Sequence, residues 1–547
     1  MENKSDPFDI ADALSDVNTA WMKDDEAFRR CCHTLNESLQ STHAKVLKHL
    51  QSFPEDIRDD GESTIVQWVG KMAWSSQQYH RAWSEWIAAY VDHAPDLPKS
   101  SRRRARFWIN QIQNMLEPAN YFWTNPKAVQ RFFQSRGESL SQGLRNWMDD
   151  ASTRKGLVSL CDESSFTLGQ DLAATAGSVI FRNELMELIQ YAPQTEKVRQ
   201  IPIVLVQPWI NKYYIFDLSR HNSFVAYLVR QGFTVFITSW KNPGPDLRHI
   251  TFADYMFKGA LRAAQVAREV CNVPSVHLAG YCIGGTLITT LMGWLAQEKT
   301  DIPISDVTLF STLVDFSEPG DIGVLLPPDI IEAVEEQTAD TGILEKHQIA
   351  ATFRMLNPRD LIWRYAVNNY FFGEKPPRSD MLYWNSDGTN LPQAMCNFYL
   401  NAFYKANRIV HPGGLIIGGR SIDLGMVRTP FYIVGAAKDH ICPWKSAFKT
   451  CRLMGGKVRF ILADEGHITG IVNPPSKWSK KKYWAAAATR RRNADKWLEK
   501  QVTSKGSWWP DWIHWLEPKS GPKVLPPRAG TPTLPPLCPA PGTYVLE

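Results

Sequence analysis

The stretch VHLAGYCIGGTL, residues 276–287, joins an apolar run to a glycine-rich turn and the start of a helical pattern. Its centre, Gly280-Tyr281-Cys282-Ile283-Gly284, has the form G-x-C-x-G. A strand, a sharp turn and a helix are the context of a nucleophile elbow, where small residues on both sides of the nucleophile let strand and helix approach closely. The motif predicts Cys282 as a displayed nucleophile. For so short a motif, the alternative is a glycine-rich turn around a buried, inert cysteine.

Short apolar runs on both sides of the elbow extend the pattern. They are residues 201–209, 233–240, 275–280, 307–313, 430–435 and 458–463. Helix-like stretches separate them, and buried strands alternating with helices indicate a parallel sheet covered on both faces. The predicted fold class is therefore α/β, and together with the elbow it is an α/β-hydrolase fold.

The remaining chain divides by composition. Residues 1–64 are predicted to form a polar extension, residues 65–200 a mainly helical N-terminal domain, and residues 201–547 the catalytic domain. An insertion at about 316–410 is long enough to carry structure of its own, and a lid over the active site is the usual form. The proline-rich tail at about 517–547 predicts an extended surface arm.

The composition limits which classes of function are expected. With 547 residues, 44% of them hydrophobic, the chain can bury a large core, and two domains are expected. A net charge of +5 makes no case for nucleic-acid binding. Nine cysteines without C-x-x-C pairs suggest neither disulfides nor a metal site, and they fit a reducing, cytoplasmic compartment. The polar N-terminus lacks a signal-peptide core, and no apolar run approaches the ~18–20 residues of a membrane span.

Two further residues complete a nucleophile–acid–histidine order. Asp439 follows the strand run 430–435 and His467 follows the run 458–463. The carboxyl ends of parallel strands meet at one edge of a sheet, where such folds hold their ligands. Cys282, Asp439 and His467 are therefore predicted to form a catalytic triad, with His467 as the general base.

Neighbouring residues offer alternatives. His440 adjoins Asp439 and either supports the acid or bonds within a neighbouring loop. His277 lies inside a strand run, where a hydrogen-bonded core histidine is the expected role. Asp464 and Glu465 are rival acids, but a side chain so near in sequence to His467 seldom has the geometry to orient it.

The oxyanion hole of this architecture uses the backbone N–H of the residue after the nucleophile, here Ile283. The loop after an early strand supplies a second donor, near Trp209 or Ile210. Cysteine in place of serine indicates acyl transfer from a thioester, because an acyl group held on a thiol remains activated.

Eight sequence blocks in order resemble the polyhydroxyalkanoate (poly-3-hydroxybutyrate) synthases. They are LEPANYFWTNP (116–126), RGESLSQGLRNW (136–147), FRNELMELIQY (181–191), PWINKYYIFDL (208–218), GYCIGGT (280–286), YWNSDGTNLP (383–392), DHICPW (439–444) and GHITGIVNPP (466–475). The resemblance covers roughly residues 65–547. The helical region before the catalytic domain is similar to the single-subunit types, and GHITGIVNPP to the short-chain-preferring class I.

This resemblance implies an acyltransferase that polymerises (R)-3-hydroxyacyl-CoA and releases CoA. It makes Cys282 the acylated nucleophile and His467 its base, while Asp439 helps to activate the hydroxyl of the growing chain. Trp384 falls in the family's lid region and is expected to cover the site. One departure is Lys438, which stands where an acidic residue is common in the family.

The resemblance also implies a setting. Family members act as cytoplasmic homodimers at the surface of polyester granules, where granule-coat proteins are further partners; the CoA thioester is a substrate, and no cofactor is expected. The tryptophans of 508–515 either contact polymer or pack in the core, and packing is favoured. The alternatives are a Cys-dependent thioesterase or intracellular polyester depolymerase of the same fold, and a non-catalytic granule-binding paralogue.

Overall fold

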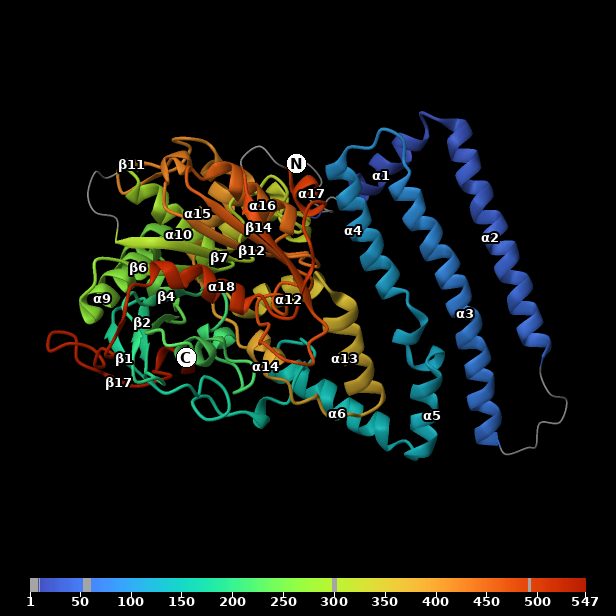
Figure 1. Ribbon diagram of the computed structural model, residues 1–547. Helices are drawn as coiled ribbons and strands as arrows, with labels where there is room; N and C mark the ends of the chain where they lie inside the picture. Colours follow the sequence, from blue (N-terminus) through green and yellow to red (C-terminus); the bar gives the residue numbers. More distant parts are fainter. Residues whose placement is uncertain (1–7, 9, 53–60, 298–302, 490–492) are drawn as a thin grey trace. The chain divides into compact units, whose positions relative to one another are not determined.

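The computed structural model describes residues 8, 10–52, 61–297, 303–489 and 493–547 (Figure 1). The chain divides into two compact units. The helical unit contains the chain up to Asp162 together with Ala350–Arg378. The sheet unit contains Glu163–Ile349 and Ser379–Glu547. The backbone therefore passes between the units three times.

The sheet unit is built on an 11-stranded sheet whose central strands are parallel, in the order β13-β12-β7-β6-β4-β5. Their bounds are β4 Ile203–Val206, β5 Val235–Trp240, β6 Val276–Tyr281, β7 Ile304–Phe310, β12 Phe431–Ala436 and β13 Val458–Ala463. These strands coincide with the apolar runs in the sequence. The predicted parallel sheet is confirmed.

Antiparallel strands extend both edges of this core. They are β1 Gly177–Arg182, β2 Met186–Tyr191 and β17 Cys538–Pro539 on the β5 side, and β14 Lys482–Ala488 and β15 Ser504–Lys505 on the β13 side. Among the described residues, three short ladders lie outside the sheet: β3 Val198–Arg199 with β16 Lys523–Val524, β8 Ile343–Leu344 with β9 Leu391–Pro392, and β10 Ile416–Ile417 with β11 Arg420–Ser421.

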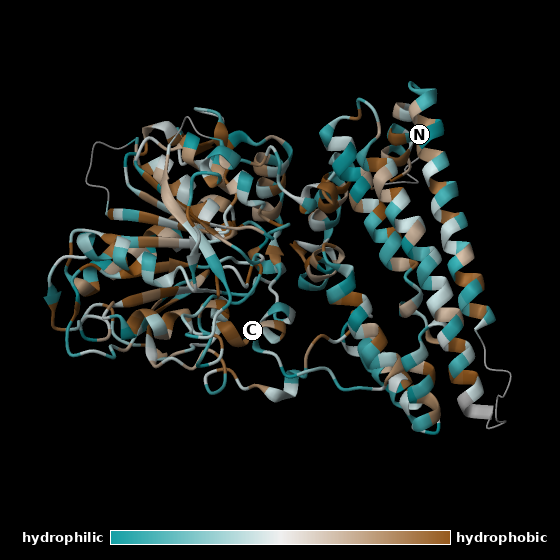
Figure 2. Cartoon of the chain, turned by 45° about the vertical axis from the view of Figure 1, so that its right-hand side comes forward, coloured by the Kyte–Doolittle hydropathy of each residue, from teal (hydrophilic) through white to brown (hydrophobic). Residues whose placement is uncertain are grey.

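Each face of the sheet packs its own hydrophobic core. Val204 and Val206 of β4 belong to one buried cluster, whereas Ile203 and Leu205 belong to another. Side chains alternate across a strand, so the two clusters lie on opposite faces. Figure 2 shows the resulting concentration of hydrophobic residues in the strands.

Helices cover both faces. They are α7 Phe224–Arg230, α8 Phe252–Asp254, α9 Arg262–Cys271, α10 Ile283–Leu295, α16 Trp444–Leu453, α17 Ala494–Leu498 and α18 Trp509–Leu516. Leu287 of α10 packs in the cluster of Val204, and Trp512 of α18 packs in the cluster of Ile203. Trp508, Trp509 and Trp512 are each at most 1% exposed, which confirms core packing for these tryptophans.

The insertion between β7 and β12 is divided between the units. Its helices in the sheet unit are α11 Pro328–Thr341, α14 Asp380–Ser386 and α15 Gln393–Tyr399. Residues 350–378, including α13 Arg364–Ala366, belong to the helical unit. Helix α12 spans Lys346–Met355. The continuous insertion predicted at 316–410 therefore contributes to two different cores.

In the described part of residues 1–162, the helical unit contains six α-helices: α1 Ile10–Trp21, α2 Asp25–Gln51, α3 Gly61–Asp92, α4 Lys99–Met115, α5 Pro126–Gln134 and α6 Glu138–Thr153. Residues 350–378 dock against this part through polar contacts. The Asn146 side chain donates to the Asn369 carbonyl at 2.9 Å, and the Tyr370 hydroxyl donates to Asp150 at 2.8 Å.

The observed boundaries differ from those expected. The sheet unit begins at Glu163 instead of residue 201, because β1 and β2 belong to the sheet. Buried Glu187 and Gln190 interrupt the apolar pattern of β2, so it does not read as a core strand. The polar extension 1–64 contains α1 and α2, while its residues 1–7, 9 and 53–60 lie outside the described residues.

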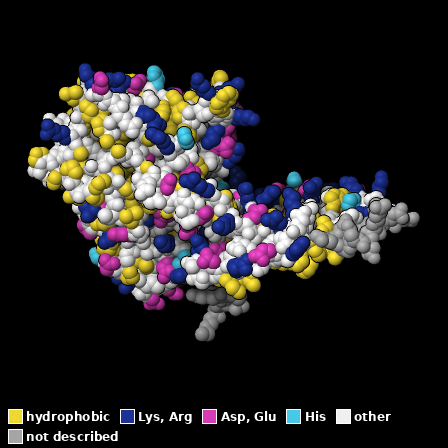
Figure 3. All heavy atoms as spheres, turned by 90° about the horizontal axis from the view of Figure 1, so that it is seen from below, with side chains coloured by type: hydrophobic (Ala, Val, Ile, Leu, Met, Phe, Trp, Pro, Cys, Tyr) yellow, Lys and Arg dark blue, Asp and Glu magenta, His cyan; other side chains and the backbone are white. Residues whose placement is uncertain are grey.

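The surface is mixed in character. On the face drawn in Figure 3, basic and acidic side chains are interspersed, in line with the small net charge. Among the described residues, no helix is both long and apolar enough to cross a membrane.

Candidate active site

Cys282 occupies the turn between β6 and α10 with φ 52° and ψ −122°. A positive φ is strained for any residue with a side chain, as a nucleophile elbow requires. The flanking glycines permit this turn. A Cβ on Gly280 would lie 2.7 Å from the Gly285 backbone, and one on Gly284 would lie 2.5 Å from the Val206 carbonyl oxygen.

Asp439 and His467 follow β12 and β13, and the structure brings them together with Cys282. The His467 Nδ1 atom lies 2.7 Å from Asp439 Oδ2. The other carboxylate oxygen, Oδ1, accepts the backbone N–H groups of Ile441 and Cys442 at 3.0 and 2.7 Å. The carboxylate is thereby fixed in one orientation and buried beside the imidazole.

The electrostatic setting keeps a proton on His467. Burial lowers the pKa of this imidazole, but the Asp439 carboxylate and the Cys282 thiolate, which also hydrogen-bonds to it, together raise the pKa to about 10. At neutral pH, His467 is therefore a cation next to a sulfur nucleophile. A protonated imidazole in this position supplies a proton to a leaving group.

The expected oxyanion residues border the elbow. Ile283 is the first residue of α10, so its N–H is one of the donors left free at a helix start. Trp209 and Ile210 follow β4, whose end lies against the first turn of α10 at Gly284. Either residue remains a candidate for the second donor.

The rival residues have other contacts. The His277 ring nitrogens lie 2.7 Å from Asp306 Oδ2 and 2.9 Å from Ser520 Oγ, as expected for a core histidine. The Lys438 amine lies 3.6 Å from the Glu465 carboxylate. Because Nδ1 of His467 is held by Asp439, neither Glu465 nor Asp464 orients the imidazole.

His440 and Trp384 each hydrogen-bond to a neighbouring loop. The His440 carbonyl accepts the Asp321 N–H at 3.0 Å, which ties the Asp439 loop to a neighbouring loop. Trp384 is buried, and its indole N–H donates to the Lys212 carbonyl at 2.7 Å. Trp384 is thus packed against the loop that follows β4.

Two tyrosines near Cys282 had no signal in the sequence. Burial is the main cause that raises the pKa of Tyr399 and of Tyr404, and electrostatic repulsion from Cys282 raises both pKa values further. Both tyrosines come from the insertion between β7 and β12. No motif in residues 393–405 marks them, because tertiary packing alone brings them near the sulfur.

None of the nine cysteines, all of which lie in the described ranges, forms a disulfide. Within the described ranges, no group of three or more His, Cys, Asp or Glu side chains has the arrangement of a metal site.

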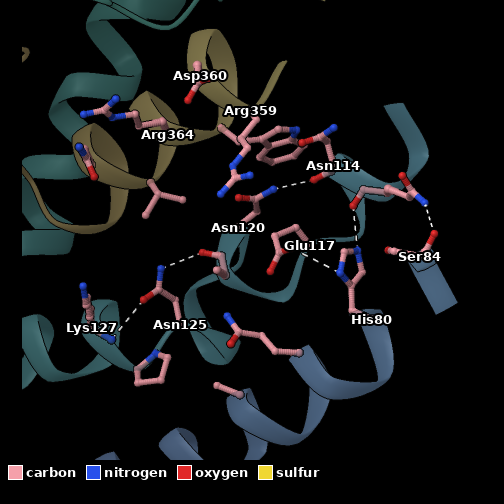
Figure 4. A pocket seen from close by; sticks show the side chains of 18 of the residues that line it. His80, Ser84, Asn114, Glu117, Asn120, Asn125, Lys127, Arg359, Asp360 and Arg364 are labelled. Carbon is pink, nitrogen blue, oxygen red and sulfur yellow. Dashed lines mark hydrogen bonds and ion pairs between the residues drawn. The ribbon is translucent and has the colours of Figure 1, made fainter. Parts of the chain in front are cut away.

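A cavity of about 990 Å³ lies within the helical unit (Figure 4). Arg359 projects into it towards Asn120, and His80 and Glu117 line the wall opposite. The His80 Nδ1 atom lies 3.4 Å from the Glu117 carboxylate and its Nε2 lies 2.9 Å from the Gln113 carbonyl.

The amide side chains of this cavity bond mainly to the backbone. Four side-chain amides each donate to a backbone carbonyl at 2.6–2.8 Å: Gln113 to Ser84, Asn114 to Asn110, Asn120 to Asn114 and Asn125 to Ala119. These bonds connect α3, α4 and the turns that follow, so they account for the amides as internal ties of the helical unit.

Two family models match overlapping parts of the chain. A family model described as "Poly-beta-hydroxybutyrate polymerase (PhaC) N-terminus" matches residues 65–228, and a model of the "alpha/beta hydrolase fold" matches residues 202–474. The chain is 39% identical to the "Poly(3-hydroxyalkanoate) polymerase subunit PhaC" of Cupriavidus necator, covering 83% of this chain and 77% of that protein. It is 35% identical to the "Poly(3-hydroxyalkanoate) polymerase" of Methylorubrum extorquens, covering 100% and 91%. It is 39% identical to "Poly(3-hydroxyalkanoate) polymerase 2" of Ectopseudomonas oleovorans, covering 86% and 85%.

Proposed function

Because the chain belongs to the poly(3-hydroxyalkanoate) polymerase family, we propose that it is an acyltransferase that joins (R)-3-hydroxyacyl groups from CoA thioesters into a polyester and releases CoA. The observation that carries this proposal is the elbow cysteine beside the His467–Asp439 pair. A thiol nucleophile keeps the bound acyl group activated for transfer.

The first half of the reaction loads Cys282. The thiolate attacks the thioester carbonyl of the substrate, a new C–S bond forms, and the C–S bond to CoA breaks. His467 transfers its proton to the departing CoA sulfur, so that CoA leaves as a thiol. The N–H of Ile283 and a second N–H from the loop after β4 stabilise the oxyanion that forms on the way.

The second half forms the ester. The 3-hydroxyl of another unit or of a chain end attacks a thioester carbonyl, and neutral His467, held by Asp439, accepts the hydroxyl proton. The thiolate of Cys282 is regenerated when it is the leaving group. Tyr399, Tyr404 and Trp384 belong to the insertion that we propose as the lid, and exclusion of water there favours transfer over hydrolysis.

The family membership and the helical region before the catalytic core support a single-subunit, class I enzyme that acts as a homodimer. We place it in the cytoplasm at the granule surface, with granule-coat proteins as further partners and no bound cofactor or metal. Sedimentation of the purified chain with and without substrate analogue tests the dimer.

The function is tested with (R)-3-hydroxybutyryl-CoA. Purified protein and Cys282→Ala are incubated with the thioester, while CoA release and the acyl product are measured. We expect insoluble polyester and CoA from the wild type and neither from Cys282→Ala. Free 3-hydroxybutyrate with the same dependence on Cys282 would contradict the polymerase and identify a thioesterase. No CoA release from this or a medium-chain substrate would contradict both and favour a non-catalytic paralogue.

A further inference from the structure

Residues 384–390, here called the strap, bind the loop that follows β4. The strap lies in the insertion between β7 and β12, and the loop, residues 207–212, contains both candidates for the second oxyanion donor. The contact is made by backbone pairing between Asn211 and Gly388 and by hydrogen bonds to successive loop carbonyls. The two segments are more than 170 residues apart along the chain.

Thr389 makes two of these hydrogen bonds by itself. Its hydroxyl donates to the Trp209 carbonyl at 2.5 Å, and its backbone N–H donates to the Ile210 carbonyl at 3.1 Å. Thr389 is 1% exposed, so no solvent competes for these carbonyls. The Trp384 indole holds the Lys212 carbonyl at the end of the same loop.

Holding these carbonyls also fixes the N–H groups of the loop. In a trans peptide group, the C=O of one residue and the N–H of the next point in opposite directions. When Thr389 holds the Trp209 carbonyl, the N–H of Ile210 faces away from the strap. The other end of the loop is held as well, since the Trp240 indole donates to the Gln207 carbonyl at 2.7 Å.

The Trp209 side chain prevents the loop from following a displaced strap. Its indole packs against Trp240, Tyr255, Phe252 and Tyr399, with ring centroids 5.1–6.3 Å apart. With the ring held in the core, loss of the Thr389 hydroxyl bond leaves rotation of the Trp209–Ile210 peptide group as the available relaxation. Such a rotation changes where the loop N–H groups point.

We propose that Thr389 is a positioning residue for catalysis, which holds the loop after β4 in the conformation that presents the second oxyanion donor. This inference rests on the proposed acyl transfer. It gives the insertion a second role: besides covering the site as a lid, the insertion supports the loop that forms the oxyanion hole. Thr389 acts through the loop and does not touch the reacting atoms.

Three variants test the assignment. Thr389→Val removes the hydroxyl and keeps the backbone bond to Ile210, whereas Thr389→Ser keeps both. The matched control is Thr338→Val in α11 of the same insertion, since Thr338 is also fully buried and donates its hydroxyl to the Val334 carbonyl at 2.8 Å. Rapid-quench measurement of the first turnover gives the rate and the amplitude of CoA release for each protein.

The rate and the amplitude of the CoA burst distinguish a positioning role of Thr389 from a structural one. We expect Thr389→Val to lower the burst rate roughly tenfold or more with unchanged amplitude, because outright loss of an oxyanion donor typically lowers kcat by about 10²–10³. Thr389→Ser and Thr338→Val should keep the wild-type rate. A wild-type burst rate in Thr389→Val, or a loss of amplitude alone, would overturn the inference.

A second acyl donor separates failure of this inference from failure of the proposed function. The same burst is followed with 4-nitrophenyl butyrate, in which Cys282 forms the thioester and 4-nitrophenolate leaves. If the wild type releases 4-nitrophenolate but no CoA from hydroxyacyl-CoA, the polymerase proposal fails while the variants still report on Thr389. A Thr389→Val burst equal to that of the wild type with this ester would again overturn the positioning role.

Discussion

At the scale of single residues, the raised pKa of His467 is the main electrostatic feature of the site. An isolated imidazole has a pKa of about 6.5, whereas Asp439 and the Cys282 thiolate, acting against burial, hold this one near 10. Between these two pH values, His467 keeps a proton that an ordinary histidine would have lost. The sulfur of Cys282 therefore faces a cation throughout the neutral range.

Replacement of His467 by Gln should slow the alkylation of Cys282 by iodoacetamide at pH 7 by roughly tenfold or more, because the thiolate loses its cation. The ratio of wild-type to variant rates should fall as the pH approaches 10, where the wild-type imidazolium itself loses its proton. Peptide mapping by mass spectrometry isolates Cys282 from the other eight cysteines. His440→Gln is the control, and a ratio that does not change between pH 7 and pH 10 would contradict the assigned protonation.

Cys282, Asp439 and His467 could be selected from the sequence as candidates because each follows a recognisable strand in the expected order, and the structure places the three side chains together. Thr389, Tyr399 and Tyr404 could not be identified in the same way. The path of the insertion brings Tyr399 and Tyr404 near Cys282 and Thr389 against the loop after β4, and local sequence patterns do not encode that path. The choice of Asp439 as the partner of His467 rested on strand order and on the closeness in sequence of the rival acids Asp464 and Glu465 to the histidine.

At the scale of elements, the junction between α10 and the end of β4 leaves no room for a side chain. A Cβ on Gly284 would lie 2.5 Å from the Val206 carbonyl oxygen and 2.9 Å from that of Gln207. The first turn of α10, which begins with the Ile283 N–H, therefore touches the strand that leads into the oxyanion loop.

Gly284→Ala should separate α10 from β4 and destabilise the protein by about 1–3 kcal/mol, the usual range for overpacking. Because the displacement occurs at the oxyanion hole, CoA release should fall more than stability alone explains. Thermal unfolding and the first-turnover rate are measured on the same preparation. Wild-type values of both would show that the junction has more room than the geometry indicates.

At this scale, the sequence predicted some strands and missed others. The six parallel strands are buried on both faces and read as continuous apolar runs, so all six were predicted. Strands β1 and β2 were missed because Glu187 and Gln190 are buried polar residues inside β2. The Glu187 carboxylate binds Arg182 of β1 and accepts the backbone N–H groups of Thr543 and Tyr544; the last two contacts exist only once the tail has folded.

At the scale of the whole molecule, the helical unit depends on a segment from the middle of the chain. Residues 350–378 contribute backbone that α6 approaches without a side chain between them: a Cβ on Gly143 would overlap the backbone of Tyr370. The domains predicted from composition were continuous in sequence, so they could not assign residues 350–378 to the N-terminal unit.

Gly143→Ala should loosen residues 350–378 from α6 and accelerate tryptic cleavage after the exposed Arg359 and Arg364 several-fold. The control is Gly70→Ala on α3, where nothing lies within 4 Å of the added Cβ and alanine favours a helix by roughly 0.5–1 kcal/mol. Equal cleavage of Gly143→Ala and wild type would show that the segment is held by its other contacts.

The three crossings between the units have a consequence during synthesis. Residues up to Asp162 leave the ribosome first, yet their unit is completed only by Ala350–Arg378. At about 5–20 residues per second, the nascent helices wait on the order of ten to forty seconds for that segment. During this interval, the surfaces of α6 that later bind Asn369 and Tyr370 are without their partners. A ribosome-bound chaperone that shields these surfaces would therefore raise the yield of folded protein most while residues 163–349 are being translated.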